Sequence, residues 1–286
     1  MSAELPVLVG IDGSLDGLIA LGWAASYATL RRAPVHAVYV LDDQRQLPAS
    51  TSPTGPDDGS EVLADALQEL ERLRFTAASL EVRHGHPTKV LLELSERAQA
   101  LVVGRRGMGG FAELVLGSTS QACTALSTDV PLIVVPDTWD PTAPPHRRIV
   151  VGIDGSVEGQ DALRFAFELA DATNAELLGV HAVAVRESYP DPNVWVDPSR
   201  QPWAGAADQL LAQTLDDWTA KYPEVRVDRR VVADHAVRSL AQESELADLL
   251  VVGGLGHTAF SELRLGSVAR GLLHHSHCPV AVIHHT

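Results

Sequence analysis

The sequence has few cysteines and no long hydrophobic run. Cys123 and Cys278 are the two cysteines among 286 residues, which is too few for a disulfide framework and indicates a reducing compartment. No run approaches the roughly 18 apolar residues of a membrane helix. The N-terminal residues show neither the basic segment nor the apolar core of a signal peptide. We therefore expect a cytoplasmic protein with no membrane partner.

Positive charge is also scarce. The chain has 22 Lys and Arg against 37 Asp and Glu, a formal net charge of −15. Such a charge argues against binding to nucleic acid or to anionic lipid, but a loop of backbone amides still attracts a small anion locally. The Gly-Lys-Ser/Thr of a Walker A loop and the Gly-x-Gly-x-x-Gly of a dinucleotide-binding fold are both missing. A nicotinamide cofactor is thus not expected.

An internal repeat divides the chain. Val7–Ser14, VLVGIDGS, matches Ile149–Ser156, IVVGIDGS. The stretch between the repeats, DTWDPTAPPHRR at 137–148, is rich in proline and reads as a linker. We predict two domains, at residues 1–137 and 147–286.

Both halves alternate strand-like apolar runs with amphipathic helical segments, which indicates a parallel sheet with helices on both faces. The expected strands lie at about 6–11, 35–40, 80–84, 100–103, 131–135, 149–153, 176–182, 225–231, 248–252 and 280–283. The expected helices lie at about 17–31 (capped by Asp16), 61–74, from Pro87 onward, 119–127, 158–172, 205–221 and 236–246. The long loop 186–203 contains three aromatic residues, which we expect to pack against the protein.

A glycine-rich stretch follows a buried-strand run in each half, with the spacing Gly-x2-Gly-x9-Gly-Ser. Glycines allow close approach of a ligand to the backbone, and free N–H groups at a helix start attract anions. This pattern predicts a phosphate site, with plain strand–helix turns as the alternative. The glycines and serines are Gly104, Gly107, Gly117 and Ser118 in the first half, and Gly253, Gly256, Gly266 and Ser267 in the second.

Asp12 and Asp154 follow the first strand of each half. An aspartate before glycine commonly caps a turn, and that role is compatible with one in ligand binding. Ligands of such sheets bind beyond the carboxyl ends of the strands. If the strands at 6–11 and 100–103 are neighbours, the Asp12 loop and the Gly104 loop line one crevice.

The last residues, HHSHCPVAVIHHT, combine histidine with Cys278. A metal site is one interpretation, but no spacing such as C-x2-C is present. A solvated helix end and chain terminus explain these residues better, and we expect no metal site. No Ser-His-Asp or Cys-His arrangement can be assigned, so no catalytic residue is predicted.

Taken together, these motifs resemble those of the universal stress proteins in their tandem-domain form, over nearly the whole chain. The resemblance implies two similar doubly wound α/β domains, each with a five-stranded, mainly parallel sheet of order 3-2-1-4-5 flanked by helices. It also implies ATP as the ligand, with Mg²⁺ able to accompany the phosphates. The aspartates would lie beside the adenosine and Val40 against the adenine, while the glycine loops would hold ribose and phosphates. The residues expected to bind are Gly10, Asp12, Gly13, Val40, Gly104, Arg105, Arg106, Gly107, Gly117, Ser118 and Thr119, then Gly152, Asp154, Gly155, Gly253, Gly256, Gly266, Ser267 and Val268.

The two loops differ in charge. The first carries Arg105 and Arg106, where the second has Gly254 and Leu255. We therefore expect the first half to bind ATP more tightly, unless His257 or Arg264 replaces the arginines.

Three functions are compatible with the sequence. The first is an ATP-binding regulatory or stress-response protein with at most slow hydrolysis. The second is an adenine-nucleotide-dependent transferase or slow ATPase of the related α/β class. The third is a structural dimer module with vestigial sites. We also expect a homodimer, with strands 132–135 and 280–283 as candidates for pairing, and a regulatory protein partner that the sequence does not identify.

Overall fold

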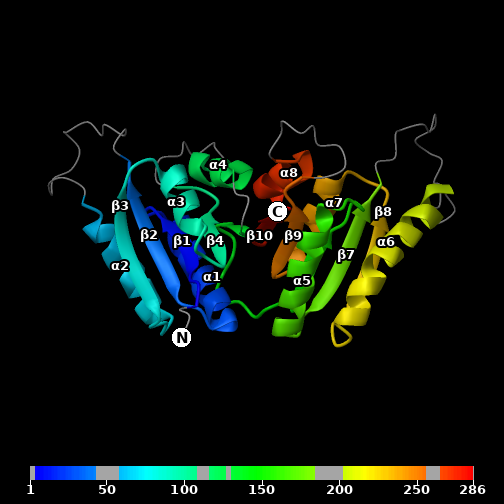
Figure 1. Cartoon of the computed structure of the whole chain (residues 1–286), viewed down its shortest axis with the longest axis horizontal. Coiled ribbons are helices and arrows are strands. Elements are labelled where there is room, and N and C mark those ends of the chain that lie inside the picture. The colour runs from blue at the N-terminus through cyan, green and yellow to red at the C-terminus, as the bar shows by residue number, and fades with distance from the viewer. Residues whose placement is uncertain are drawn as a thin grey trace. The chain divides into compact units, whose positions relative to one another are not determined.

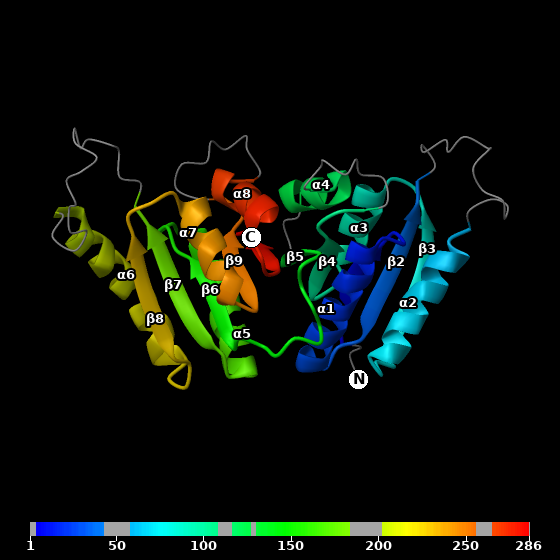
Figure 2. The same ribbon diagram turned by 180° about the vertical axis from the view of Figure 1, so that it is seen from behind.

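A computed structural model of the chain describes residues 4–42, 58–107, 116–126, 130–183, 202–255 and 265–285. It consists of two compact units, residues 1–143 and 144–285, called here the first half and the second half. Both halves have the same succession of strands and helices, which can be followed by colour in Figure 1 and from behind in Figure 2. None of the helices that the structure describes is long and apolar enough to cross a membrane.

The first half contains a five-stranded sheet of order β3-β2-β1-β4-β5, so the predicted strand order is confirmed. All its neighbouring strands are parallel, and β1 lies in the middle with Val7 opposite Val35 on one side and Ala100 on the other. Its elements are β1 (Val7–Ile11), α1 (Leu15–Arg31), β2 (Val35–Leu41), α2 (Ser60–Arg72), β3 (Ala78–His84), α3 (Pro87–Ser95), β4 (Ala100–Gly104), α4 (Ser118–Leu126) and β5 (Leu132–Val135).

The second half repeats this arrangement with the order β8-β7-β6-β9-β10. Its strands are again parallel, with β6 between β7 and β9. Its elements are β6 (Arg148–Gly152), α5 (Gly159–Thr173), β7 (Glu176–Ala182), α6 (Pro202–Lys221), β8 (Val227–Val232), α7 (Ala236–Glu243), a 3₁₀ turn (Ser244–Leu246), β9 (Leu249–Gly253), α8 (Ser267–His275) and β10 (Val280–Ile283).

Helices cover both faces of each sheet. In the first half α1 and α2 pack together on one face while α3 and α4 pack on the other, and α5 with α6 and α7 with α8 do the same in the second half. The strands in the middle are therefore buried on both sides, which is why β1 and β4 read as nearly continuous apolar runs. In the second half Phe167 of α5 is fully buried and stacks on Trp218 and Tyr222 near the end of α6.

The start of α1 differs from the prediction. The helix begins at Leu15, and its cap is Ser14 rather than Asp16. Ser14 has an extended backbone, and its hydroxyl accepts a hydrogen bond from the Gly17 amide at 3.1 Å. Asp16 lies in the first turn, where it is buried and has a different partner.

Other boundaries differ from the predicted ones by a few residues. For example, α6 begins at Pro202 and β8 begins at Val227. The aromatic loop predicted at 186–203 lies outside the described residues, apart from the backbone at the start of α6.

Candidate functional site

Asp12 organises the turn between β1 and α1. Its Oδ1 accepts hydrogen bonds from the Ser14 amide at 3.1 Å and from the Ser14 hydroxyl at 2.5 Å. Gly13 supplies the left-handed backbone of this turn, with φ of 81°, a conformation that side chains disfavour. The capping role predicted for Asp12 is thus present. Its Oδ2 faces another part of the chain.

The second half repeats this turn. Asp154 Oδ1 accepts from the Ser156 amide at 2.9 Å and from the Ser156 hydroxyl at 2.6 Å. Gly155 has φ of 80°, and the Ser156 hydroxyl accepts from the Gly159 amide at 3.1 Å. The two turns have the same hydrogen bonds, so the repeat in sequence is a repeat in structure.

The Asp12 turn and the first glycine loop meet beyond the carboxyl ends of β1 and β4. These strands are direct neighbours, with Gly10 opposite Val103. The α-carbon of Gly107 packs so closely against the Asp12 carboxylate that an added Cβ would collide with Oδ2. Gly104 is packed against α1, because a Cβ there would stand 2.7 Å from the Asp16 carbonyl. The Asp12 turn and the first glycine loop are therefore direct neighbours, as the adjacency of β1 and β4 requires.

Backbone hydrogen bonds fix the two ends of the first glycine loop. The Arg105 amide donates to the Val135 carbonyl at 2.8 Å, and the Gly117 amide donates to the Arg105 carbonyl at 2.8 Å. Gly117 does not have a left-handed backbone, and a Cβ on it would meet backbone atoms of the loop no closer than 3.4 Å. Ser118 is exposed at the first position of α4, with Thr119 half-buried behind it.

Arg106 binds two carboxylates. Its amide donates to Asp16 Oδ2 at 3.0 Å, its Nε lies 3.7 Å from the same oxygen, and its Nη2 pairs with Asp137 just after β5. Burial raises the pKa of Asp16 because it disfavours the carboxylate, and the hydrogen bond from Arg106 only partly offsets this. A phosphate would have to compete with both carboxylates for Arg106. The structure thus gives Arg106 a structural role that the sequence did not predict.

The second glycine loop packs against different residues from the first. Gly253 ends β9 next to the start of α5. A Cβ added to Gly253 would lie 3.9 Å from the α-carbon of Gly159. Gly254 is buried against the ring of His284, and Leu255 takes the place of Arg106. Ser267 is exposed at the first position of α8, and Val268 is half-buried. Gly256, together with His257 and Arg264, lies outside the described residues.

The remaining predicted residues lie at the same edge of their sheets. Gly10 packs on Leu91 of α3 and Gly152 on Leu240 of α7, with added Cβ atoms at 2.9 and 3.0 Å from these side chains. Val40 is near the end of β2 and is 8% exposed. Gly266 precedes α8, and its amide donates to the Gly254 carbonyl at 2.7 Å.

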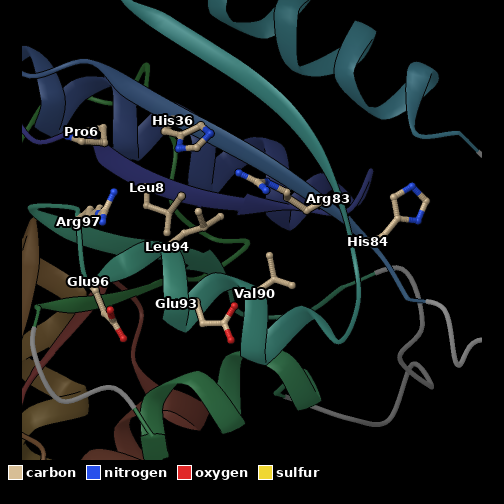
Figure 3. A pocket seen from close by; sticks show the side chains of 10 residues that line it. All are labelled: Pro6, Leu8, His36, Arg83, His84, Val90, Glu93, Leu94, Glu96 and Arg97. Atoms are coloured by element: carbon tan, nitrogen blue, oxygen red, sulfur yellow. The ribbon is translucent and has the colours of Figure 1, made fainter.

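The first half also has a cavity that sequence reasoning missed. It has a volume of about 580 Å³ and lies between α3 and the strands β1, β2 and β3 (Figure 3). Its lining combines apolar side chains with two arginines, Arg83 and Arg97, and two glutamates, Glu93 and Glu96. The charges therefore favour no single class of ligand. The signal in the sequence was His36, a polar residue within the apolar run of β2. None of the predicted site residues lines this cavity.

In the second half, an ion pair crosses the corresponding place. Arg230 of β8 pairs with Glu243 of α7. When the two halves are aligned, these residues correspond to Glu81 and Leu94 of the first half. The two halves therefore differ on this face of the sheet as well.

The histidines near the end of the chain have separate environments. Cys278 is buried, the His277 amide donates to the Ser244 hydroxyl, and His285 pairs with Asp161. Burial raises the pKa of the Cys278 and Cys123 thiols to about 12. Within the described ranges, no group of three or more His, Cys, Asp or Glu residues is arranged to hold a metal ion.

Two domains share a parallel five-stranded sheet in which the strands of each half follow the order 3-2-1-4-5. In the first, an Asp turn lies beside a glycine loop. The chain belongs to the universal stress protein family, whose family model matches residues 5–136 and 145–284. A universal stress protein of Mycobacterium tuberculosis is 32% identical over 292 residues, covering 96% of each chain. One of Mycolicibacterium smegmatis is 31% identical over 301 residues, covering 99% of this chain and 98% of its own.

A solved structure has the same fold over nearly the whole length. The crystal structure of a universal stress protein from Archaeoglobus fulgidus covers 98% of both chains, with a TM-score of 0.68 and 18% identity. The tandem arrangement predicted from the repeat is thus confirmed.

Proposed function

We propose that this protein binds ATP at the carboxyl edge of its sheets and serves as a regulatory stress-response protein. The observation that carries the proposal is the contact between Gly107 and the Asp12 carboxylate. It joins two repeated motifs at the place where parallel α/β sheets bind ligands. Gly104 and Gly107 leave no room for a Cβ beside Asp16 and Asp12, so the two loops pack closely together. Glycine backbones also let a ligand approach the amides of the loop.

The residues proposed to hold the nucleotide have distinct roles. In the first half, Asp12 and Val40 would lie beside the adenosine, and Gly104, Gly107 and Gly117 would line the phosphates. Mg²⁺ would accompany the phosphates. The full set comprises Gly10, Asp12, Gly13, Val40, Gly104, Arg105, Gly107, Gly117, Ser118 and Thr119, with Arg106 positioning the loop, and Gly152, Asp154, Gly155, Gly253, Gly256, Gly266, Ser267 and Val268 in the second half.

The test is Gly107→Ala in the full chain. The added methyl group collides with Asp12 Oδ2, so the Asp12 carboxylate or the glycine loop must shift. We expect ATP binding by the first half to weaken by about tenfold or more, as for the loss of one phosphate hydrogen bond. Isothermal titration calorimetry measures the affinity, and circular dichroism checks the fold.

Gly205→Ala is the matched control. Gly205 lies in α6 with no atom within 4 Å of an added Cβ, and we expect no change in ATP affinity. Equal affinities for Gly107→Ala and the wild type would show that this loop is not the phosphate site. A wild-type chain that binds no ATP would refute the proposed function altogether.

We further propose that ATP hydrolysis is slow and that the role of the nucleotide is regulatory, through a homodimer or a protein partner. Phosphoryl transfer needs a base or water-positioning residue and metal ligands, and the described residues provide no group in such a role at the glycine loops. We expect turnover below about 1 per second, under the ordinary range for enzymes. A steady-state rate above this with Mg²⁺, abolished by Asp12→Ala, would support the transferase or ATPase alternative.

A further inference from the structure

Gly254 occupies the same place in the second glycine loop as Arg105 in the first. The Arg105 amide donates to the carbonyl of Val135, the last residue of β5. The Gly254 amide donates at 2.7 Å to the carbonyl of Ile283, the last residue of β10. The carbonyls of Arg105 and Gly254 then accept from Gly117 and Gly266. The two backbones are therefore equivalent, although one position has a cationic side chain and the other has none.

A histidine ring fills the space that this side chain would take. An added Cβ on Gly254 would collide with Cε1 and Nδ1 of His284, and Nε2 would be 2.9 Å away. His284 directly follows β10, where the first half has Pro136 after β5. The second loop thus has an imidazole at the point where the first loop has the stem of an arginine.

The next residue fixes the course of the chain at this point. His285 Nδ1 lies 2.7 Å from Asp161 Oδ2 on α5, and Asp161 is also paired with Arg164 at 2.7 Å. In the first half the residue at the corresponding place, Asp137, pairs instead with Arg106 in the loop. His284 is consequently held between the last strand and an anchored neighbour, beside the glycine loop.

We propose that His284 supplies the phosphate-contacting side chain of the second half, in place of Arg105. A neutral imidazole has one N–H donor, and a protonated imidazole has two, so the ring can donate to a phosphate oxygen of bound nucleotide. Pro136 has no such donor. The proposal rests on the proposed function, since it assigns a contact within that ATP site.

The experiment reduces the contribution of the first half by using Gly107→Ala in the full chain as background. Adding His284→Ala should weaken the remaining ATP binding by about tenfold, the usual scale of one charge-assisted hydrogen bond. His284→Gln, which keeps an N–H donor, should retain an affinity within about threefold of the background. His277→Ala is the matched control, because His277 is an exposed histidine of the same half, and it should have no effect.

A spectroscopic measurement follows His284 directly. In protein labelled with ¹³C-histidine, the imidazole signal that disappears in His284→Ala should shift when ATP is added. Unchanged affinity in His284→Ala, or an unmoved signal, would overturn the assignment. Equal losses in the Ala and Gln variants would also overturn it, because they would show that the ring only packs against Gly254.

The two proposals fail in different ways. If the wild type binds ATP but the Gly107→Ala background does not, the second half has no site and the role of His284 is refuted, while the function stands for the first half. If the wild type itself binds no ATP, the proposed function is refuted.

Discussion

Asp12 and Ser14 illustrate how single residues define the start of each candidate site. One carboxylate oxygen accepts two bonds from the serine, and the serine oxygen accepts one from the amide of Gly17. The other carboxylate oxygen faces Gly107. The same aspartate therefore shapes the turn and borders the glycine loop.

Ser14→Ala should destabilise the first half by about 1 kcal/mol, the typical cost of losing a helix cap. Ser156→Ala removes the same bonds in the second half, so its cost should be similar. Urea unfolding, followed separately for the transition of each half, gives the two free energies. A cost near zero for both would show that water replaces the hydroxyl without loss.

Sequence reasoning predicted some residue contacts and missed others for a physical reason. The meeting of Asp12 with the glycine loop follows from strand adjacency, because carboxyl ends of parallel strands share one edge. The bonds of Arg106 to Asp16 and Asp137 depend on side-chain directions across three elements. Periodicity does not encode these directions. The His284 ring on Gly254 was hidden for the same reason.

Among the elements, α1 and the first glycine loop are tied together by Asp16. Its carboxylate holds the Arg106 amide and lies near the Arg106 side chain, while its backbone packs on Gly104. Helix and loop should therefore move as one body. The order of elements was predictable from alternating apolar periodicities, but this link between them was not.

Asp16→Asn should alter the pH dependence of stability. The pKa of Asp16 is raised from its ordinary 3.8 by burial, so the folded state holds more protons than the unfolded state between the two pKa values. The contribution of Asp16 to the stability of the fold is thus lost as pH rises through that window. Asparagine does not titrate, so the stability of the variant relative to wild type should increase from about pH 4 upward.

Urea unfolding of both proteins between about pH 4 and 7 checks this. A difference that stays constant, or that increases as pH falls, would contradict the raised pKa. The ATP affinity of the variant provides a second reading, because the loop loses its carboxylate anchor.

At the scale of the whole molecule, two copies of one fold have different candidate sites. The sequence alone predicted that the first half binds ATP more tightly, because of its arginines. In the structure, Arg106 is bound by two carboxylates and the second loop has His284 beside it. The difference between the halves should be smaller than two free arginines would cause.

Asp12→Ala and Asp154→Ala should each leave mainly the other site. We expect their ATP affinities to differ by about tenfold or less, the scale of one charge-assisted hydrogen bond, with the first half tighter. Calorimetric titration of the two variants measures this. Tighter binding by the chain that keeps only the second half would show that Arg105 contributes less than His284.

The contact between Gly254 and His284 also limits how one half can be converted into the other. An arginine at 254 would have to displace the ring that stands against the α-carbon, and replacing His284 first leaves the second loop with neither side chain. Only the paired change to arginine and proline reproduces the combination found at Arg105 and Pro136. Grafting the first loop into the second half therefore requires the residue after β10 to be exchanged as well. The order in which the two single substitutions are made also matters when one loop is converted into the other.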